Sequence, residues 1–154
     1  MKRMLSVFLA LCMLLVVSSC KKTSRETGKV SLKVEYTEVV ENLESAQYGI
    51  APEKRDALSP DGVVLSLQDV SFSDADTAMS ILLSELKKAK KHFQEKDGYV
   101  SAIDNVYAGD CGNVSGWMFF VNGELSEVGA REYTPKEGDE ILFRYVVNYM
   151  ALFE

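Results

Sequence analysis

The sequence predicts an α+β domain in which one main helix packs across a mixed or antiparallel sheet, in the manner of a β-grasp. Two observations predict this fold class. Stretches of alternating apolar and polar residues lie on both sides of a single long amphipathic stretch, and clusters of turn residues separate them. No internal repeat or low-complexity run interrupts this order.

The first half of the domain opens with a predicted strand. Residues 30–36 alternate apolar and polar side chains, which is the period of a half-buried strand. Residues 42–62 lose this period and end in a Ser-Pro-Asp-Gly turn, so we expect a long connection before strand character resumes at 63–67. A loop of this length is usually functional or covers another part of the molecule.

The main helix is expected to begin at Ser73-Asp74-Ala75-Asp76. Ser73 or Asp74 can cap free backbone N–H groups there, and Asp76 suits the positive end of the helix dipole. Apolar residues then follow at spacings of three and four over about five turns, which predicts a core helix. These residues are Ala75, Ala78, Met79, Leu82, Leu86, Ala89 and Phe93.

The second half predicts three more strands. Residues 99–107 and 116–121 have strand character, and a tight turn follows at Asn122-Gly123, since both residues tolerate positive φ. Residues 140–147 form the last predicted strand. Its apolar residues Ile141, Phe143, Tyr145 and Val147 share one face.

The N-terminal residues predict a secreted lipoprotein. Lys2 and Arg3 precede an apolar run that ends at Val17, which is too short for a transmembrane helix, so we interpret residues 1–19 as a signal peptide. The run is followed by Ser-Ser-Cys, which resembles the bacterial lipobox and predicts that Cys20 is lipidated. An ordinary cleaved signal peptide is the alternative.

This interpretation divides the chain and gives it a location. Residues 20–28 form a polar tether, and residues 29–154 form the domain. The expected location is the bacterial cell envelope, outside the cytoplasm, with the lipid on Cys20 as the only membrane attachment. Removing residues 1–19 removes Lys2 and Arg3 and no acidic residue, so the formal charge falls from -6 to -8. Such an acidic protein is not suited to binding nucleic acid.

Residues with catalytic or metal-binding chemistry are sparse. Cys111 is the only cysteine of the predicted domain, and a structural cysteine is favoured over a reactive thiol, since no base lies near it in sequence. His92, the only histidine, is expected on the helix surface, so no metal site and no catalytic cofactor are predicted. Catalytic motifs are missing, and a pair of carboxylates is the one enzymatic possibility left open. We therefore predict that the protein is not an enzyme.

The predicted strand 116–121 is apolar on both faces. Trp117, Phe119 and Val121 point one way, and Met118 and Phe120 point the other. One set packs against the helix, and the other is either covered by residues 42–62 or open to a ligand or partner. We predict that Met118 and Phe120 belong to the core and that Trp117 and Phe119 belong to a recognition surface.

Several stretches in this order resemble the transcobalamin-like C-terminal domain family, a domain largely of unknown function in bacterial surface proteins. The resemblance covers residues 29–147, nearly all of the predicted domain. The stretches are Leu58-Ser59-Pro60-Asp61-Gly62-Val63-Val64, Asp76-Thr77, Gly98-Tyr99-Val100-Ser101-Ala102-Ile103, Ser115-Gly116-Trp117-Met118-Phe119-Phe120-Val121-Asn122-Gly123, Val128-Gly129-Ala130 with Tyr133, and Lys136-Glu137-Gly138-Asp139-Glu140-Ile141.

The resemblance implies a β-grasp-like fold and a bound small molecule. In the vertebrate cobalamin carriers, the related domain is the smaller half of a clamp that closes over a corrinoid. Trp117 and Phe119 fall where a contact strand would lie, and we add Val121 and Tyr133 as candidate ligand-binding residues. This chain lacks the helical-barrel half of the clamp. We therefore expect a non-catalytic binding module with cobalamin as the sharpest candidate ligand; the alternative is a structural or adhesion module that binds another envelope protein or a polysaccharide.

Overall fold

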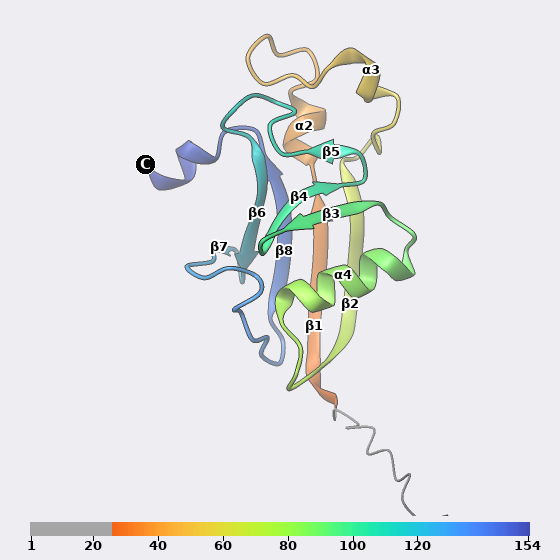
Figure 1. Ribbon diagram of the computed structural model, residues 1–154, viewed down its shortest axis with the longest axis vertical. Coiled ribbons are helices and arrows are strands. Elements are labelled where there is room, and N and C mark those ends of the chain that lie inside the picture. The colour runs from red at the N-terminus through yellow and green to blue at the C-terminus, as the bar shows by residue number, and fades with distance from the viewer. Residues whose placement is uncertain (1–25) are drawn as a thin grey trace, which may run out of the picture.

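The structure is a computed structural model that describes residues 26–154 and contains two sheets. The main sheet has five strands in the order β2-β1-β8-β6-β7, and the small sheet has three in the order β3-β4-β5 (Figure 1). The strands are β1 (Glu26–Glu35), β2 (Val63–Ser73), β3 (Phe93–Lys96), β4 (Tyr99–Ile103), β5 (Val106–Tyr107), β6 (Gly116–Val121), β7 (Glu124–Leu125) and β8 (Glu140–Val146). The helices are α2 (Thr37–Glu41), α3 (Pro52–Arg55), α4 (Ala78–Lys88) and the 3-10 helix η2 (Tyr149–Phe153).

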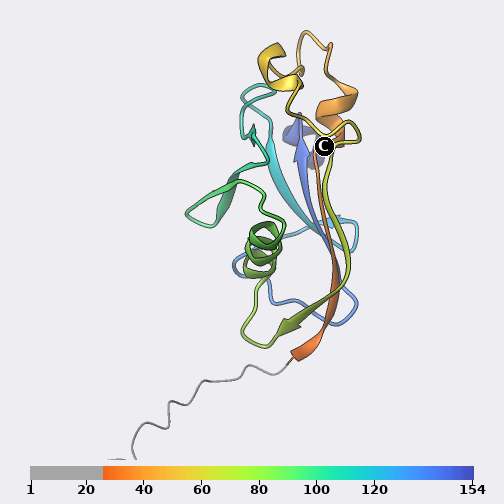
Figure 2. The same cartoon turned by 90° about the vertical axis from the view of Figure 1, so that its right-hand side faces the viewer.

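The main sheet is mixed, which is one of the two arrangements that the sequence predicts. β1 and β8 run parallel at its centre, and the other neighbouring strands are antiparallel. Helix α4 and the small sheet lie on the same side of the main sheet (Figure 2). The architecture is therefore α+β with one main helix, and the core lies between the main sheet and this covering layer.

Strand β1 confirms the predicted alternation and extends it. Val30, Leu32 and Val34 are buried. The strand begins at Glu26, three residues before the predicted domain boundary, and Glu26 pairs with Ser73 of β2. Residues 26–28 thus belong to the sheet instead of the predicted tether.

Helix α4 is shorter than predicted. It covers Ala78–Lys88, and Ser73, the expected cap, is the last residue of β2. Asp76 accepts hydrogen bonds from the backbone and hydroxyl of Ser73 at 2.9 and 2.7 Å, so it stabilises the turn before the helix. Thr77 is the actual N-cap and forms a reciprocal capping box with Ser80.

The prediction for residues 89–107 was also too simple. Lys90 has a φ of 55°, which is incompatible with a continuing helix, and Phe93 begins β3 instead of ending the helix stripe. The single strand predicted at 99–107 is interrupted at Asp104 and Asn105, which have φ values of 48° and 70° and form a tight turn between β4 and β5. His92 is exposed, as predicted, but lies after the helix.

The long connection at 42–62 covers the end of the core. Together with α2 it forms the upper end of the molecule in Figure 1, and Val39 and Ile50 are buried there. Gly62 has a φ of 68°, and a side chain at this position would collide with the backbone of Thr37, so the predicted turn requires glycine.

Candidate functional site

The faces of β6 are opposite to those predicted. Trp117, Phe119 and Val121 pair across the strands with Tyr145, Phe143 and Ile141 of β8, and these three β8 residues are buried in the core. Trp117 itself is only 3% exposed. Because directly opposed residues of antiparallel strands share a face, the side that carries Trp117 faces the core. The predicted assignment of Met118 and Phe120 to this core is wrong.

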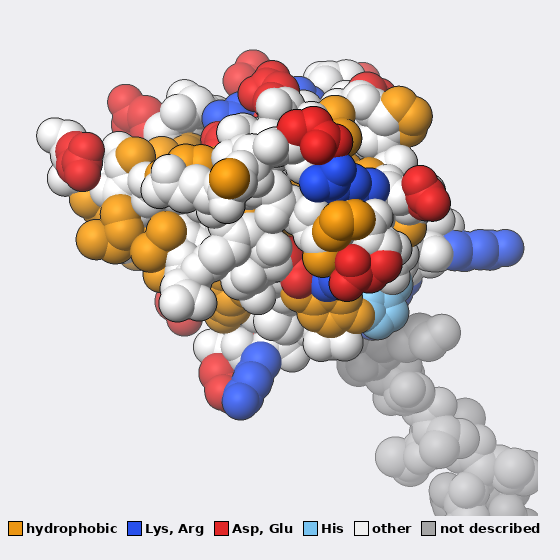
Figure 3. Space-filling model, turned by 90° about the horizontal axis from the view of Figure 1, so that it is seen from above, with side chains coloured by type: hydrophobic (Ala, Val, Ile, Leu, Met, Phe, Trp, Pro, Cys, Tyr) orange, Lys and Arg blue, Asp and Glu red, His pale blue; other side chains and the backbone are white. Residues whose placement is uncertain are grey.

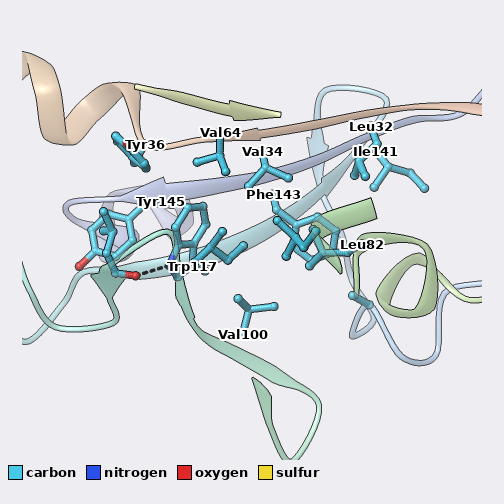
Figure 4. Close-up of a cluster of buried hydrophobic side chains, with 14 of the residues drawn as sticks. Leu32, Val34, Tyr36, Val64, Leu82, Val100, Trp117, Ile141, Phe143 and Tyr145 are labelled. Carbon is cyan, nitrogen blue, oxygen red and sulfur yellow. Dashed lines mark hydrogen bonds between the residues drawn. The ribbon is translucent and has the colours of Figure 1, made fainter. Parts of the chain in front are cut away.

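Trp117 joins the two sheets. Its indole Nε1 donates a hydrogen bond of 3.0 Å to the carbonyl of Val106 in the small sheet. Its ring lies edge-on to Tyr145, with 5.5 Å between the centroids (Figure 4). Trp117 therefore has a structural role, since its one polar group and its apolar surface both find partners within the domain.

A mostly apolar hollow of about 170 Å³ nevertheless opens beside β6. It lies between β6, β4, the first turn of α4 and the loop after β7. The side chains that define it include Met79, Tyr99, Trp117, Phe119, Leu125 and Ala130.

The four predicted ligand-binding residues divide into two groups. Trp117 and Phe119 line the hollow, whereas Val121 and Tyr133 do not. Tyr133 contacts the site indirectly, because its ring packs edge-on to Phe119 at 5.7 Å and its hydroxyl donates to Asp139 at 2.8 Å. Burial and the bond to Asp139 raise the pKa of Tyr133 to about 12, so this hydroxyl remains a neutral donor.

Two members of the hollow were not predicted as site residues. Tyr99 is 44% exposed, and its hydroxyl lies beside Gly116 at the start of β6. A side chain at Gly116 would collide with this hydroxyl. Met79 comes from the first turn of α4, and its sequence pattern identifies it only as a core residue. Tyr99 and Met79 come from different elements, and only the tertiary structure brings them together beside β6. The Gly98-Tyr99 stretch is nevertheless one of the stretches that carry the family resemblance.

The loop after β7 forms the rear wall of the hollow and is fixed to α4. The backbone N–H groups of Met79 and Ala78 donate to the carbonyls of Ala130 and Tyr133 at 2.8 and 3.1 Å. These N–H groups belong to the first turn, where a helix supplies no internal acceptor. The loop therefore satisfies the helix N-terminus and holds Ala130 beside the hollow.

A second set of bonds fixes the turn at the end of β6. The side-chain amide of Asn122 donates to Asp139 at 3.0 Å, and its carbonyl accepts from the backbone of Glu140 at 2.9 Å. Asn122 and Gly123 have φ values of 53° and 84°, as the predicted tight turn requires. Asp139 thus connects the β6–β7 turn to the start of β8 and stabilises the register that brings Trp117 to the core face.

The opposite face of β6 is covered by a charged side chain. Phe120 is 6% exposed, and the guanidinium carbon of Arg144 lies 5.7 Å from the centre of its ring. Arg144 also donates to Glu35 at 2.7 Å, and Glu35 is 2% exposed. Burial raises the pKa of Glu35, but hydrogen bonds and charge from Lys33 and Arg144 outweigh it, so the net pKa is lowered.

Cys111, a free cysteine, does not line the hollow. Cys111 is buried, and burial together with the charge of Asp110 raises its pKa to about 11, which disfavours the reactive thiolate. Among residues 26–154, no group of three His, Cys, Asp or Glu side chains is placed to hold a metal ion. In the same part of the chain, no helix has the length and apolar character needed to cross a membrane. The predicted signal peptide and lipidated Cys20 lie outside the described residues.

Comparison with known proteins identifies the fold. Residues 75–146 match a family described as a domain of unknown function (DUF4430). A crystal structure of haptocorrin in complex with Cbi is similar, with a TM-score of 0.51 and 13% identity over 77% of this chain. The domain is transcobalamin-like in fold. The chain spans a quarter of the haptocorrin chain, since the similarity covers 25% of it. No curated protein matches the chain.

Proposed function

We propose that the protein is a non-catalytic binding module of the bacterial cell envelope, held outside the cytoplasm by a lipid on Cys20, and that its sharpest candidate ligand is a corrinoid. The similarity to haptocorrin, a structure that contains Cbi, is the observation that carries this proposal. The apolar hollow beside β6 supports it, because ligand sites are typically concave and lined by apolar and aromatic side chains.

The arrangement of the main sheet supports a β-grasp-like assignment. The antiparallel pair of β1 and β2 leads into α4, and the chain returns through β6 and β8, with β8 parallel to β1 at the centre. The small sheet is then an insertion between α4 and β6.

The size of the hollow limits what the domain does alone. Ligand pockets usually have volumes of about 300–1,000 Å³, whereas the hollow measures about 170 Å³. It accommodates a side-chain-sized group and leaves most of a corrinoid uncovered. We therefore propose that the domain supplies one wall of a ligand site and that a partner chain supplies the other.

The test of corrinoid binding is a calorimetric titration of residues 26–154 with cobinamide and with cobalamin. These residues contain both sheets and the whole described core. We expect weak binding that Leu125→Asn reduces and Leu142→Asn leaves unchanged, because both leucines are half-buried but only Leu125 lines the hollow. No heat of binding with either corrinoid, or an equal loss in both variants, contradicts corrinoid capture at this site.

The membrane anchor has a separate test. We expect Cys20→Ala to abolish incorporation of a palmitate analogue and to release the protein from membranes. Labelling that persists in this variant contradicts lipidation at Cys20.

The alternative function, adhesion to another envelope component, is favoured by a different surface. Met150, Leu152 and Phe153 of η2 are 53, 38 and 67% exposed. Figure 3 shows hydrophobic side chains gathered on the side of the molecule where the chain ends. Exposed apolar patches often mark protein contacts. Truncation after Asn148 should abolish adhesion and leave corrinoid binding unchanged if this function is correct.

A further inference from the structure

Strand β6 has an incompletely paired outer edge. β7 pairs only with Phe120 and Val121 of β6. Beyond this short pairing, no strand in the described part of the chain is hydrogen-bonded as a ladder partner to the outer edge of β6 from Trp117 to Phe119, although β4 lies close to β6. An exposed strand edge presents backbone donors and acceptors to another extended chain.

The backbone groups at this edge can be assigned from their neighbours. The Phe119 carbonyl points outward, because it accepts from the backbone of Ser126 at 3.0 Å. The backbone groups of Trp117 also point outward, because residues two apart in a strand turn their N–H and C=O groups to the same edge. Both groups of one strand residue project toward the same edge. The Trp117 carbonyl and the Phe119 N–H therefore face outward as one acceptor and one donor.

The other edge of the main sheet is protected by contrast. β2 carries exposed polar residues at Ser66, Gln68, Asp69 and Ser71. Asp69 has a φ of 55°, at an irregularity in the pairing of β2 with β1. Polar side chains and bulges discourage edge-to-edge pairing. The open part of β6 contains only Trp117, Met118 and Phe119 and has neither feature.

The apolar hollow adjoins this edge directly. Trp117, Met118 and Phe119 carry the open backbone and also line the hollow. An extended segment placed along β6 projects alternate side chains to the same face of the sheet. One large apolar side chain of that segment is thus positioned to enter the hollow while its backbone bonds to β6.

Exposed acidic residues flank the residues of the rear loop that line the hollow, and we call them the acidic rim. Glu124, Glu127 and Glu132 are exposed on the segment from β7 to the end of the rear loop. Arg131 does not offset them, because it bonds to Glu95 at 2.7 Å. This charge distribution favours a bound segment that carries basic residues on both sides of the apolar side chain that enters the hollow.

We propose that β6 captures an extended segment of a partner protein by strand addition, with one large apolar side chain in the hollow and basic residues at the acidic rim. Main-chain bonds supply general affinity in this mode of recognition, and the pocket supplies specificity. Peptide capture rests on the proposed binding role of the domain but does not require a corrinoid.

The test uses Trp117 as the reporter, because it lines the hollow and is the only tryptophan of the chain. The probe is the peptide acetyl-Lys-Thr-Val-Phe-Val-Thr-Lys-amide, titrated against residues 26–154. We expect a saturable change in emission. Replacing the central phenylalanine by serine keeps the charge and should weaken binding at least about ten-fold, since the buried apolar group is lost.

Backbone pairing is tested with two further peptides, each methylated on alternate backbone nitrogens along one edge. At least one of them should bind about ten-fold more weakly. Full affinity of both methylated peptides, full affinity of the serine peptide, or no binding of the parent peptide overturns the proposal.

Two controls separate this result from others. Leu125→Asn should weaken binding of the peptide, and Leu142→Asn should not. If a variant does not fold, the peptide series alone still tests strand addition at β6. Self-association of the domain through β6 in place of peptide binding also overturns the proposal. Cobinamide is titrated separately, so peptide binding without corrinoid binding rejects only the corrinoid function, and the reverse result rejects only peptide capture.

Discussion

The two faces of β6 achieve burial in different ways. On the core face, Trp117 and Phe119 pack against Tyr145 and Phe143 of the neighbouring strand, with ring centroids 5.5 and 5.1 Å apart. On the other face, Phe120 is covered by the guanidinium of Arg144. A strand with two apolar faces therefore needs only one hydrophobic core, because a long charged side chain can cover the second face while its charge is paired.

The largest effect is expected on the core face. Trp117→Ala should lower the free energy of unfolding by about 3–5 kcal/mol, since it removes a buried ring and the bond to Val106. Met118→Ala, on the half-buried opposite face, should cost about 1 kcal/mol. Urea unfolding followed by far-UV circular dichroism measures both. Equal losses would show that the two faces are energetically alike.

The cover on the second face is expected to contribute less. Arg144→Met keeps an apolar stem over Phe120 but leaves Glu35 with Lys33 as its remaining cation. We expect a loss of about 1–3 kcal/mol, because Glu35 is buried and Arg144 is partly exposed. Glu35→Gln combined with Arg144→Met should recover part of this loss in a double-mutant cycle. No loss in the single variant contradicts the role of the pair.

The sequence was sufficient to predict β1 and β8 with their buried faces, but not the buried face of β6. The period-2 pattern found β1 and β8, and Asn122-Gly123 located the turn after β6. The same pattern could not orient β6, because both of its faces are apolar. Orientation follows from the partners Phe143 and Tyr145 on β8, and this pairing is a long-range property.

The missed elements have local physical causes. The turn at Asp104-Asn105 contains no glycine, so β4 and β5 were interpreted as a single strand. Asp76 suits a helix start, but it bonds to the Ser73 turn instead. In the site, Trp117 was predicted from its own strand, whereas Tyr99 becomes a site residue only through the packing of the small sheet on β6.

Asp139, which connects the β6–β7 turn to the start of β8, should make the stability of the domain depend on pH. Burial raises the pKa of Asp139, but hydrogen bonds from Lys136, Asn122 and Tyr133 outweigh it and hold the pKa below its ordinary value of 3.8. A lowered folded-state pKa contributes stability that is present above the unfolded pKa and is lost as the pH falls through the folded pKa. We therefore expect stability to fall below about pH 4.

Asp139→Asn should reduce this acid-dependent loss and lower stability at neutral pH by about 1–2 kcal/mol. Denaturant unfolding between pH 2 and pH 7 is the measurement, with exposed Asp74→Asn as the control. If Asp139→Asn loses as much stability at low pH as the original protein, other carboxylates cause the loss. Glu35 on the opposite face is then the first candidate, because its pKa is also lowered.

The smallest effect is expected at Tyr133, which contacts the core face and the Asp139 connection together. Tyr133→Phe keeps the edge-on contact with Phe119 and removes the 2.8 Å bond to Asp139. We expect a loss of about 1 kcal/mol, the usual net value of one such bond. Loss of this donor should also raise the pKa of Asp139 toward its ordinary value, so the stability that is lost at low pH should become smaller. The contrary outcome is a larger loss of stability at neutral pH with an unchanged loss of stability at low pH. That result would show that Tyr133 acts through packing on Phe119 and not through the turn that sets the register of β6.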